Sequence, residues 1–225
     1  MMDSVFSGEA KKKREPTKKW SEGEIAAEIQ RFEDKIKDCK ENQGEIEVRD
    51  TVLEKAEFYK YEVLDYVEAE KVFREAYALT GPASKKMEIL FEILLMNIEK
   101  EDIGSVKKDI DQCLKLVEEG ADWEKKNKLK IFEGVYCILI RDFKKASNLF
   151  VSSIATFTCV ELMGFKEFIF YSVILGLLTL SRKEIKKNII HSPDVLSMNR
   201  EIPFLKQFSE SFYSCDYRTF FQAFL

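Results

Sequence analysis

An Asp followed by an aromatic or branched apolar residue recurs along this chain at a nearly constant interval. Each instance opens an amphipathic helical pattern. The instances are Asp65-Tyr66, Asp102-Ile103, Asp142-Phe143 and Asp216-Tyr217, with a weaker start at Ser181-Arg182. The first two intervals are 37 and 40 residues, and those that continue through Ser181 are about 39 and 35. This period suits two helices joined by a turn, so the sequence predicts stacked helical pairs, which usually present surfaces to other proteins.

The composition supports long helices in a globular protein. Only 9 Gly and 4 Pro occur in 225 residues, which disfavours a sheet-rich fold with many tight turns. Hydrophobic residues make up 45% of the chain and charged residues 34%. The net charge of −4 is too small to imply a nucleic-acid or membrane partner for the whole chain.

Apolar residues at helical spacing divide the chain into about ten to twelve consecutive helices. The first starts at Ser21, where Glu24 completes a capping box, and Gly44 ends it. The following helices are expected over about 48–63, 65–79, 84–100, 103–117, 122–140, 142–157 and 161–180, with shorter ones near 182–190, 201–214 and 217–225. Pro193 and Pro203 are expected to bracket an irregular connection. The prediction is an all-α solenoid over residues 20–225, after a basic tail of residues 1–19.

That tail lacks periodicity and carries the run Lys11-Lys12-Lys13-Arg14. The expectation is a disordered, solvated segment, and a nuclear localisation signal is the alternative.

The recurring Asp is expected to act as a helix cap, because its carboxylate can accept hydrogen bonds from the free N–H groups of the first turn. The aromatic or branched residue after it is expected to lie against the preceding helix. Ala69 and Ala146, four residues after their Asp, would let two helices approach closely.

No residue pattern supports catalysis, a cofactor or a metal. His191, the one histidine, is expected in an exposed loop, and no nucleophile elbow or phosphate-binding glycine loop occurs. The five cysteines are widely spaced, which favours reduced core residues over disulfides or a zinc site. The uncharged run over residues 168–181 is too short to span a bilayer and is expected to form a mostly buried helix.

Several longer stretches carry a resemblance to a known family. They are residues 47–50 (EVRD), 55–59 (KAEFY), 69–77 (AEKVFREAY), 116–130 (LVEEGADWEKKNKLK), 136–146 (YCILIRDFKKA), 161–163 (ELM) and 213–218 (YSCDYR). In this order they resemble the PCI-domain scaffold subunits of the proteasome regulatory lid. The scaffold subunits of the COP9 signalosome have a similar architecture.

The resemblance implies a tetratricopeptide-like right-handed array that leads into the helical part of a PCI module, roughly residues 160–225. The winged helix of that module is missing, so we expect the chain to be a piece of a longer protein. The implied function is a non-catalytic scaffold of the 26S proteasome lid that supports ubiquitin-dependent degradation. The alternatives are a signalosome scaffold or a generic tetratricopeptide-like adaptor.

The implied partners are other lid and regulatory-particle subunits, without nucleic acid, membrane or small-molecule substrate, in the cytoplasm and nucleus. No cofactor and no enzymatic activity are implied. The motif positions to which the resemblance draws attention are Trp123, Asn127, Arg141, Asp142, Phe143 and Tyr217. They are expected to be cap, packing or turn residues, or else a contact ridge for another subunit. For Trp123, a half-buried helix start is expected ahead of an interface anchor.

Overall fold

The computed structural model describes residues 20–42 and 44–224, and the regular elements within these ranges are all helical. The α-helices are α1 (Glu22–Asn42), α2 (Glu45–Phe58), α3 (Tyr66–Leu79), α4 (Ala83–Glu99), α5 (Ile103–Glu118), α6 (Trp123–Leu139), α7 (Phe143–Ser153), α8 (Phe165–Thr179), α9 (Arg182–Ile185), α10 (Pro193–Ser197), α11 (Pro203–Ser214) and α12 (Tyr217–Phe224). Two π-helical segments, η2 (Tyr59–Val63) and η4 (Lys186–Ile190), extend α2 and α9. The prediction of an all-α helical-repeat fold is confirmed.

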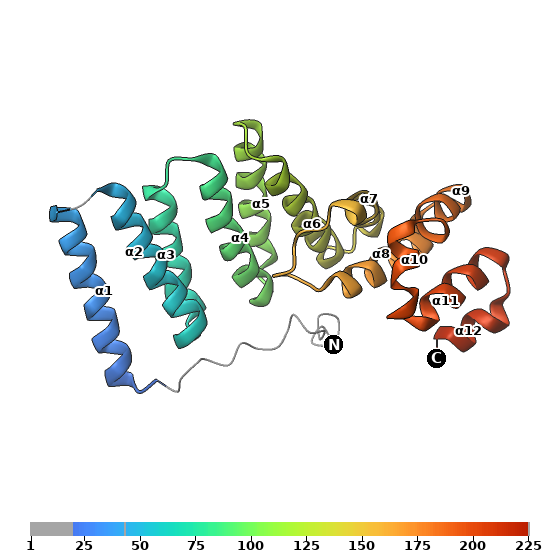
Figure 1. The fold of residues 1–225 in the computed structure, drawn as a ribbon, viewed down its shortest axis with the longest axis horizontal. Coiled ribbons are helices and arrows are strands. Elements are labelled where there is room, and N and C mark those ends of the chain that lie inside the picture. The colour runs from blue at the N-terminus through green and yellow to red at the C-terminus, as the bar shows by residue number, and fades with distance from the viewer. Residues whose placement is uncertain (1–19, 43, 225) are drawn as a thin grey trace. The chain divides into compact units, whose positions relative to one another are not determined.

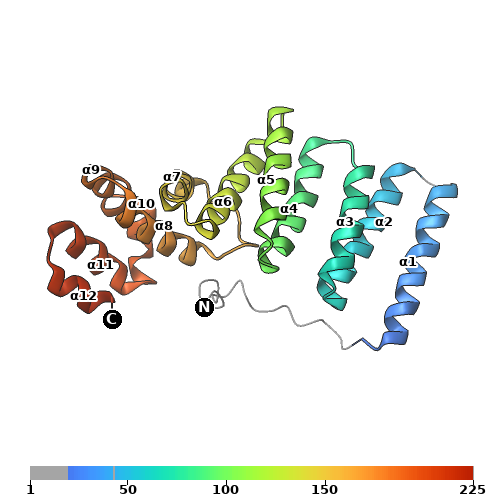
Figure 2. The same ribbon diagram turned by 180° about the vertical axis from the view of Figure 1, so that it is seen from behind.

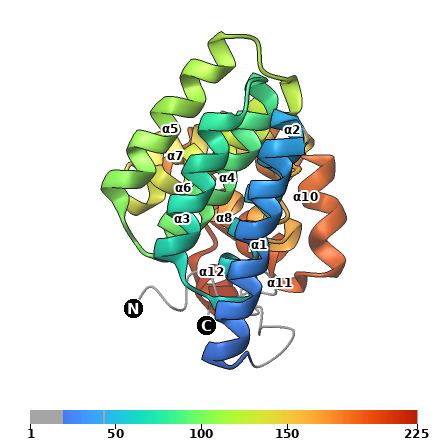
Figure 3. The same cartoon turned by 90° about the vertical axis from the view of Figure 1, so that its left-hand side faces the viewer.

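The described residues form two compact units, residues 20–125 and residues 126–224. In the first unit, α1 to α5 lie side by side as a row of antiparallel helices, which Figures 1 and 2 show from opposite sides. Figure 3 views this row from its α1 end. The predicted tail, residues 1–19, lies outside the described residues, and the predicted PCI boundary near residue 160 stays a prediction.

Three ion pairs in the first unit each join a helix to the second helix along the row, as expected of stacked pairs. Lys60 in η2 and Lys125 in α6 form ion pairs with Glu92 and Glu88 of α4. Arg74 in α3 pairs with Asp109 in α5, with 3.1 Å between Nη2 and Oδ1. These partners lie 32 to 37 residues apart in the sequence. The interval is close to that of the Asp motif, so the repeat seen in the sequence corresponds to one helical pair in space.

A buried polar cluster ties α3, α4 and α5 together. Asp109 is 1% exposed and accepts hydrogen bonds from Arg74 and from the amide nitrogen of Asn97, the latter at 2.9 Å. Burial raises the pKa of Asp109, although Arg74 and Asn97 counteract part of that shift. Burial also opposes ionisation of Glu70, but hydrogen bonds from Arg74 and Lys100 outweigh it and lower the pKa of Glu70. Nothing in the sequence pattern singles out this cluster.

The recurring Asp residues cap their helices as predicted. The carboxylate of Asp65 accepts from the N–H groups of Val67 and Glu68, that of Asp102 from Ser105, and that of Asp142 from Lys145. Asp216 does the same for Thr219. Ala69 and Ala146 are fully buried, as a place between packed helices requires.

The turns before the four capping Asp residues share one backbone geometry. The preceding residues Leu64, Glu101, Arg141 and Cys215 all adopt the left-handed conformation, with φ between 59° and 63°. The N–H groups of Asp102, Asp142 and Asp216 donate to the carbonyl five residues earlier, and that of Asp65 to Tyr59. This is the Schellman arrangement, in which the Asp ends one helix and caps the next.

Close helix packing organises the second unit. A Cβ built on Gly134 of α6 would lie 2.5 Å from Cδ1 of Phe150 in α7, so the two helices approach more closely than a larger residue permits. The Phe150 ring in turn lies 4.9 Å from that of Phe168 in α8. Further along, the rings of Phe208 in α11 and Phe220 in α12 stack with centroids 4.7 Å apart.

Two boundary predictions are wrong. The connection after Pro193 is largely helical, because Pro occupies the first turn of α10, where its missing N–H costs nothing. The helix expected over 142–157 agrees with the structure, where the 3-10 helix η3 (Ile154–Thr156) continues α7, but the next helix begins at Phe165 instead of near residue 161. Phe157 still packs against Phe168, with ring centroids 4.6 Å apart, so the apolar pattern outlasts the helix.

The cysteine prediction holds for four of the five residues. Cys39, Cys113, Cys137 and Cys159 are buried as free thiols. Burial raises the pKa of Cys113 and of Cys159 to about 12, so these thiols stay protonated and unreactive. Cys215 is exposed, contrary to the prediction, because it occupies the left-handed turn position before Asp216. His191 is exposed in a turn after η4, as predicted.

Candidate protein-contact surface

Exposed apolar residues gather at the turns that precede the capped helices. In the first unit, the turns before α3 and α5 lie on the same edge of the helix row (Figure 1). Leu64 lies in the first of these turns, and Val67 and Ile103 lie in the first turns of α3 and α5; they are 44%, 59% and 39% exposed. We call these three residues the turn edge. Large apolar side chains left in water at repeated positions are typical of protein-contact surfaces.

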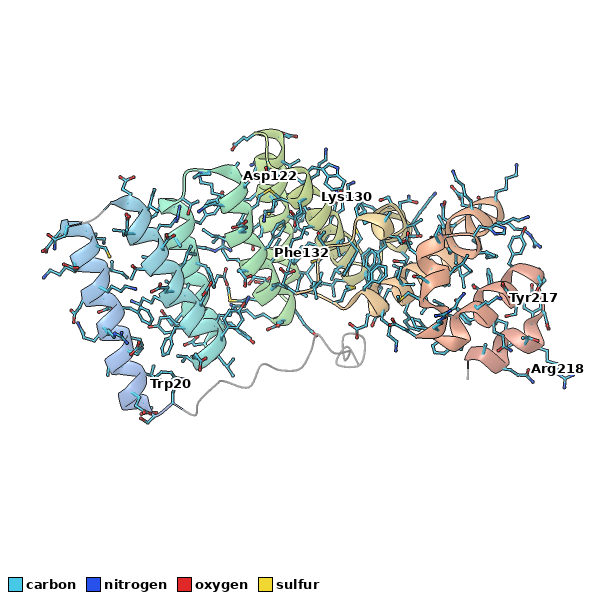
Figure 4. All side chains as sticks on the ribbon, in the orientation of Figure 1. Trp20, Asp122, Lys130, Phe132, Tyr217 and Arg218 are labelled. Carbon is cyan, nitrogen blue, oxygen red and sulfur yellow. The ribbon has the colours of Figure 1, made fainter. Side chains whose placement is uncertain are left out.

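The second unit has exposed apolar residues at the same repeat position as Ile103. Phe143 and Tyr217 directly follow their capping Asp and are 41% and 60% exposed. The expectation that the residue after Asp lies against the preceding helix is therefore wrong for Ile103, Phe143 and Tyr217. As the first helical residue after the cap, each projects outward from its turn, and Figure 4 shows Tyr217 projecting away from the helices. Tyr66 alone is half-buried, and burial raises its pKa to about 12.

Trp123 and Asn127 lie one helical turn apart in α6 but differ in environment. Trp123 is 69% exposed, so the expectation of a half-buried helix start is wrong. The loop just before it is held by a hydrogen bond of 2.6 Å from the Ser84 hydroxyl to Asp122. A large aromatic side chain on an anchored helix start can serve as an interface anchor.

Asn127 is 3% exposed and accepts a hydrogen bond of 3.2 Å from Lys130. Its amide nitrogen has no hydrogen-bond partner among the described residues. Because it is buried, Asn127 acts on packing within α6 and presents no side chain to a partner.

Arg141, Asp142 and Phe143 form one turn between α6 and α7. Arg141 is exposed in the left-handed conformation with φ of 63°, and Asp142 caps α7 through the N–H of Lys145 at 3.1 Å. Beside them, Lys145 pairs with Glu133 of α6, and this hydrogen bond raises the pKa of Lys145. The capping hydrogen bond explains why an Asp occupies position 142. The side chains of Arg141 and Phe143 are exposed and can contact a partner protein.

The described residues offer little for catalysis or cofactor binding. No group of three or more His, Cys, Asp or Glu side chains among them is placed to hold a metal ion. The pocket that is best formed in this part of the chain measures about 10 Å³, between η4, α10 and α11. Small-molecule sites need roughly 300 Å³ or more. Within the same residues, no helix combines the length and apolarity that crossing a bilayer requires.

Comparison with known proteins identifies the family. The family model described as 26S proteasome subunit RPN7 matches residues 18–188, about three quarters of the chain. The chain belongs to the RPN7 family of 26S proteasome subunits. The signalosome alternative is not favoured.

Individual relatives agree with this family. The 26S proteasome non-ATPase regulatory subunit 6 homolog of Arabidopsis thaliana is 41% identical over 197 residues, which cover 88% of this chain and 51% of the relative. The regulatory subunit 6 of Dictyostelium discoideum is 38% identical, with coverage of 89% and 52%. The regulatory subunit RPN7 of Saccharomyces cerevisiae is 30% identical, with coverage of 87% and 46%. The chain therefore spans about half the length of the curated relatives it matches.

The turn edge was not found from the sequence, although a signal was available. The motif drew attention to Phe143 and Tyr217, and Ile103 occupies the equivalent place directly after Asp102 in an earlier repeat. Leu64 and Val67 lie one residue before and two residues after Asp65. Alignment of the repeats on their capping Asp would have pointed to Ile103 together with Phe143 and Tyr217, but not to Leu64 and Val67.

Proposed function

We propose that this chain is part of a non-catalytic scaffold subunit of the 26S proteasome regulatory lid, which supports ubiquitin-dependent degradation through protein–protein contacts. Membership of the RPN7 family carries the proposal. The exposed apolar residues that recur at the helical turns support it, because they supply the contact points that a scaffold needs. The proposed partners are other lid and regulatory-particle subunits, and the proposed location is the cytoplasm and nucleus.

Scaffold contacts spread over large areas, and within them exposed aromatic residues tend to carry the most binding energy. Trp123, Phe143 and Tyr217 are therefore the side chains proposed to contact neighbouring subunits. Arg141 is proposed to contribute at the rim of the same turn as Phe143. Asp142 and Asn127 are proposed to act indirectly, by capping α7 and by packing within α6.

Affinity purification tests this function. The tagged chain, expressed in the cells it comes from, is expected to retrieve 26S proteasome subunits, including regulatory-particle ATPases. Retrieval of signalosome subunits alone would overturn the proposal.

A Trp123→Ala variant tests the contact surface within the same experiment. Removing an exposed aromatic anchor is expected to weaken retrieval by about tenfold or more without changing the folded structure. A Lys115→Ala variant is the matched control, because Lys115 is exposed and forms no ion pair among the described residues. If Trp123→Ala and Lys115→Ala behave alike, Trp123 is not a contact residue.

A further inference from the structure

A run of cations covers the outer face of the helix formed by α9 and η4. Arg182, Lys183, Lys186 and Lys187 are all exposed, while Ile185 and Ile189 on the opposite side are 5% and 1% exposed. We call these four basic residues the cationic face. It lies within the second unit, in a chain whose net charge is −4.

Among the described residues, the cationic face has no acidic partner. Elsewhere in the described residues, lysines and arginines commonly pair with acidic side chains, as Lys145 does with Glu133. Within the same residues, no carboxylate lies within ion-pair distance of the four cations. The one acid in the run, Glu184, accepts hydrogen bonds from the backbone and hydroxyl of Ser181, at 2.9 and 2.6 Å, and caps the helix.

This arrangement is unfavourable for the helix on its own. Arg182 and Lys186 are four residues apart, as are Lys183 and Lys187, so two like-charge pairs face each other along the helix. Each such pair costs an isolated helix roughly 0.2–0.5 kcal/mol. An external anion placed between them would relieve this repulsion.

One cation is held in position before any anion arrives. The Arg182 guanidinium lies over the Tyr213 ring, 4.6 Å from its centroid, and Nη1 lies 3.5 Å from the Cys215 sulfur. Stacking on an aromatic ring leaves the edge of a guanidinium free to bind carboxylates. A fixed side chain loses less entropy on binding than a free one.

We propose that the cationic face docks an acidic segment of a partner protein. The inference rests on the proposed scaffold function for the class of partner, and on charge complementarity for its chemistry. Carboxylate groups spaced along a peptide match cations spaced along one helix. Nucleic acid fits less well, because aromatic stacking residues do not alternate with these cations.

Fluorescence anisotropy with the whole chain tests the proposal. The probe is a labelled octaglutamate peptide, with an octaglutamine peptide and a short oligothymidylate as comparisons. Octaglutamate is expected to bind at about 0.1 M NaCl and to weaken strongly at about 0.5 M, because screening lengths shorten with salt. The octaglutamine peptide is expected not to bind.

Charge reversal locates the site. The double variant Lys183→Glu/Lys187→Glu is expected to weaken octaglutamate binding by about tenfold or more, because attraction becomes repulsion at two positions. The control Lys107→Glu/Lys115→Glu changes two exposed lysines of α5 and alters the net charge equally, so less than about twofold weakening is expected. If the reversed variant does not keep its helical circular dichroism, Lys183→Gln/Lys187→Gln replaces it, with weakening of about threefold or more.

Three results would overturn the proposal. They are absence of octaglutamate binding at low salt, equal weakening in both double variants, and tighter binding of oligothymidylate than of octaglutamate. Retrieval of proteasome subunits by the unmodified chain is scored separately. If the chain retrieves these subunits but does not bind octaglutamate, the scaffold function stands and the acidic docking site fails. If the chain binds octaglutamate but does not retrieve proteasome subunits, the acidic docking site stands and the proposed scaffold function fails.

Discussion

Replacement of Gly134 by Ala is a sensitive test of the packing between α6 and α7. A Cβ at this position would lie 2.5 Å from the ring of Phe150, which is fully buried and packs on Phe168. The ring cannot swing aside into solvent, so either the ring or the helices must shift. Overpacking of this kind costs about 1–3 kcal/mol. Ala gains roughly 0.5–1 kcal/mol over Gly inside a helix, so the net expected loss is about 0–2.5 kcal/mol.

The measurement is urea and thermal unfolding followed by circular dichroism. For a chain of this size, about 1 kcal/mol corresponds to a shift in Tm of roughly 2–4 °C. Gly104→Ala in α5 is the control, since its Cβ would meet only the Asp102 carboxylate at 3.5 Å. That variant is expected to be as stable as the unmodified chain or up to about 1 kcal/mol more stable. A Gly134→Ala variant that gains stability as Gly104→Ala does would refute the close packing.

A double-mutant cycle isolates the contact itself. Phe150→Leu alone is expected to destabilise the chain, because it removes ring atoms from a filled core. In the Gly134→Ala background the added methyl occupies part of the vacated space. The two effects should therefore sum to more than the loss in the double variant, with a coupling free energy of about 1 kcal/mol or more. Additive losses would show that Gly134 and Phe150 do not touch.

Three further predictions concern the turns and the buried polar cluster. Asp142→Ala is expected to lose about 1 kcal/mol of unfolding free energy in urea titration, while Asp142→Asn, which can still cap, loses little. Arg141→Gly is expected to raise the unfolding free energy by up to about 1 kcal/mol, because a non-glycine residue in the left-handed conformation costs about 1–2 kcal/mol and this exceeds the extra conformational entropy that Gly loses on folding. Arg141→Ala keeps the cost of the left-handed conformation, so this control variant should show no gain. The pKa of Asp109 is raised in the folded state, so protonation of Asp109 favours folding. The unfolding free energy of the unmodified chain, compared with that of Asp109→Asn, should therefore increase as the pH falls from neutral through the raised pKa toward the ordinary value near 3.8. A difference that stays constant with pH would contradict the raised pKa.

Local features of this fold were predictable from the sequence, because they depend on near neighbours in the chain. The capping Asp residues and the helix break at Gly44 follow from backbone hydrogen bonding alone. The late start of α8 at Phe165 was missed, because the apolar residue Met163 before it is buried although the backbone there is not helical. Pro193 was expected to bound an irregular connection, yet it starts a helix.

Features that depend on distant residues were not predictable. Asp109 looks like any acid on an amphipathic helix until Arg74 and Asn97 are brought against it from two other helices. Exposure of the residues after each Asp also depends on where the preceding helix lies. The motif positions drew attention to Trp123, Phe143 and Tyr217, but the sequence could not show that all three face solvent.

The left-handed turn before each capping Asp has a consequence for how such a chain can diverge. Leu64, Glu101, Arg141 and Cys215 share one backbone conformation although their side chains have nothing in common. The hydrogen bonds of the Asp hold that conformation, so the side chain is not needed to specify it. Substitutions at these four solvent-facing points can therefore alter which neighbour is recognised while the helical pairs keep their geometry.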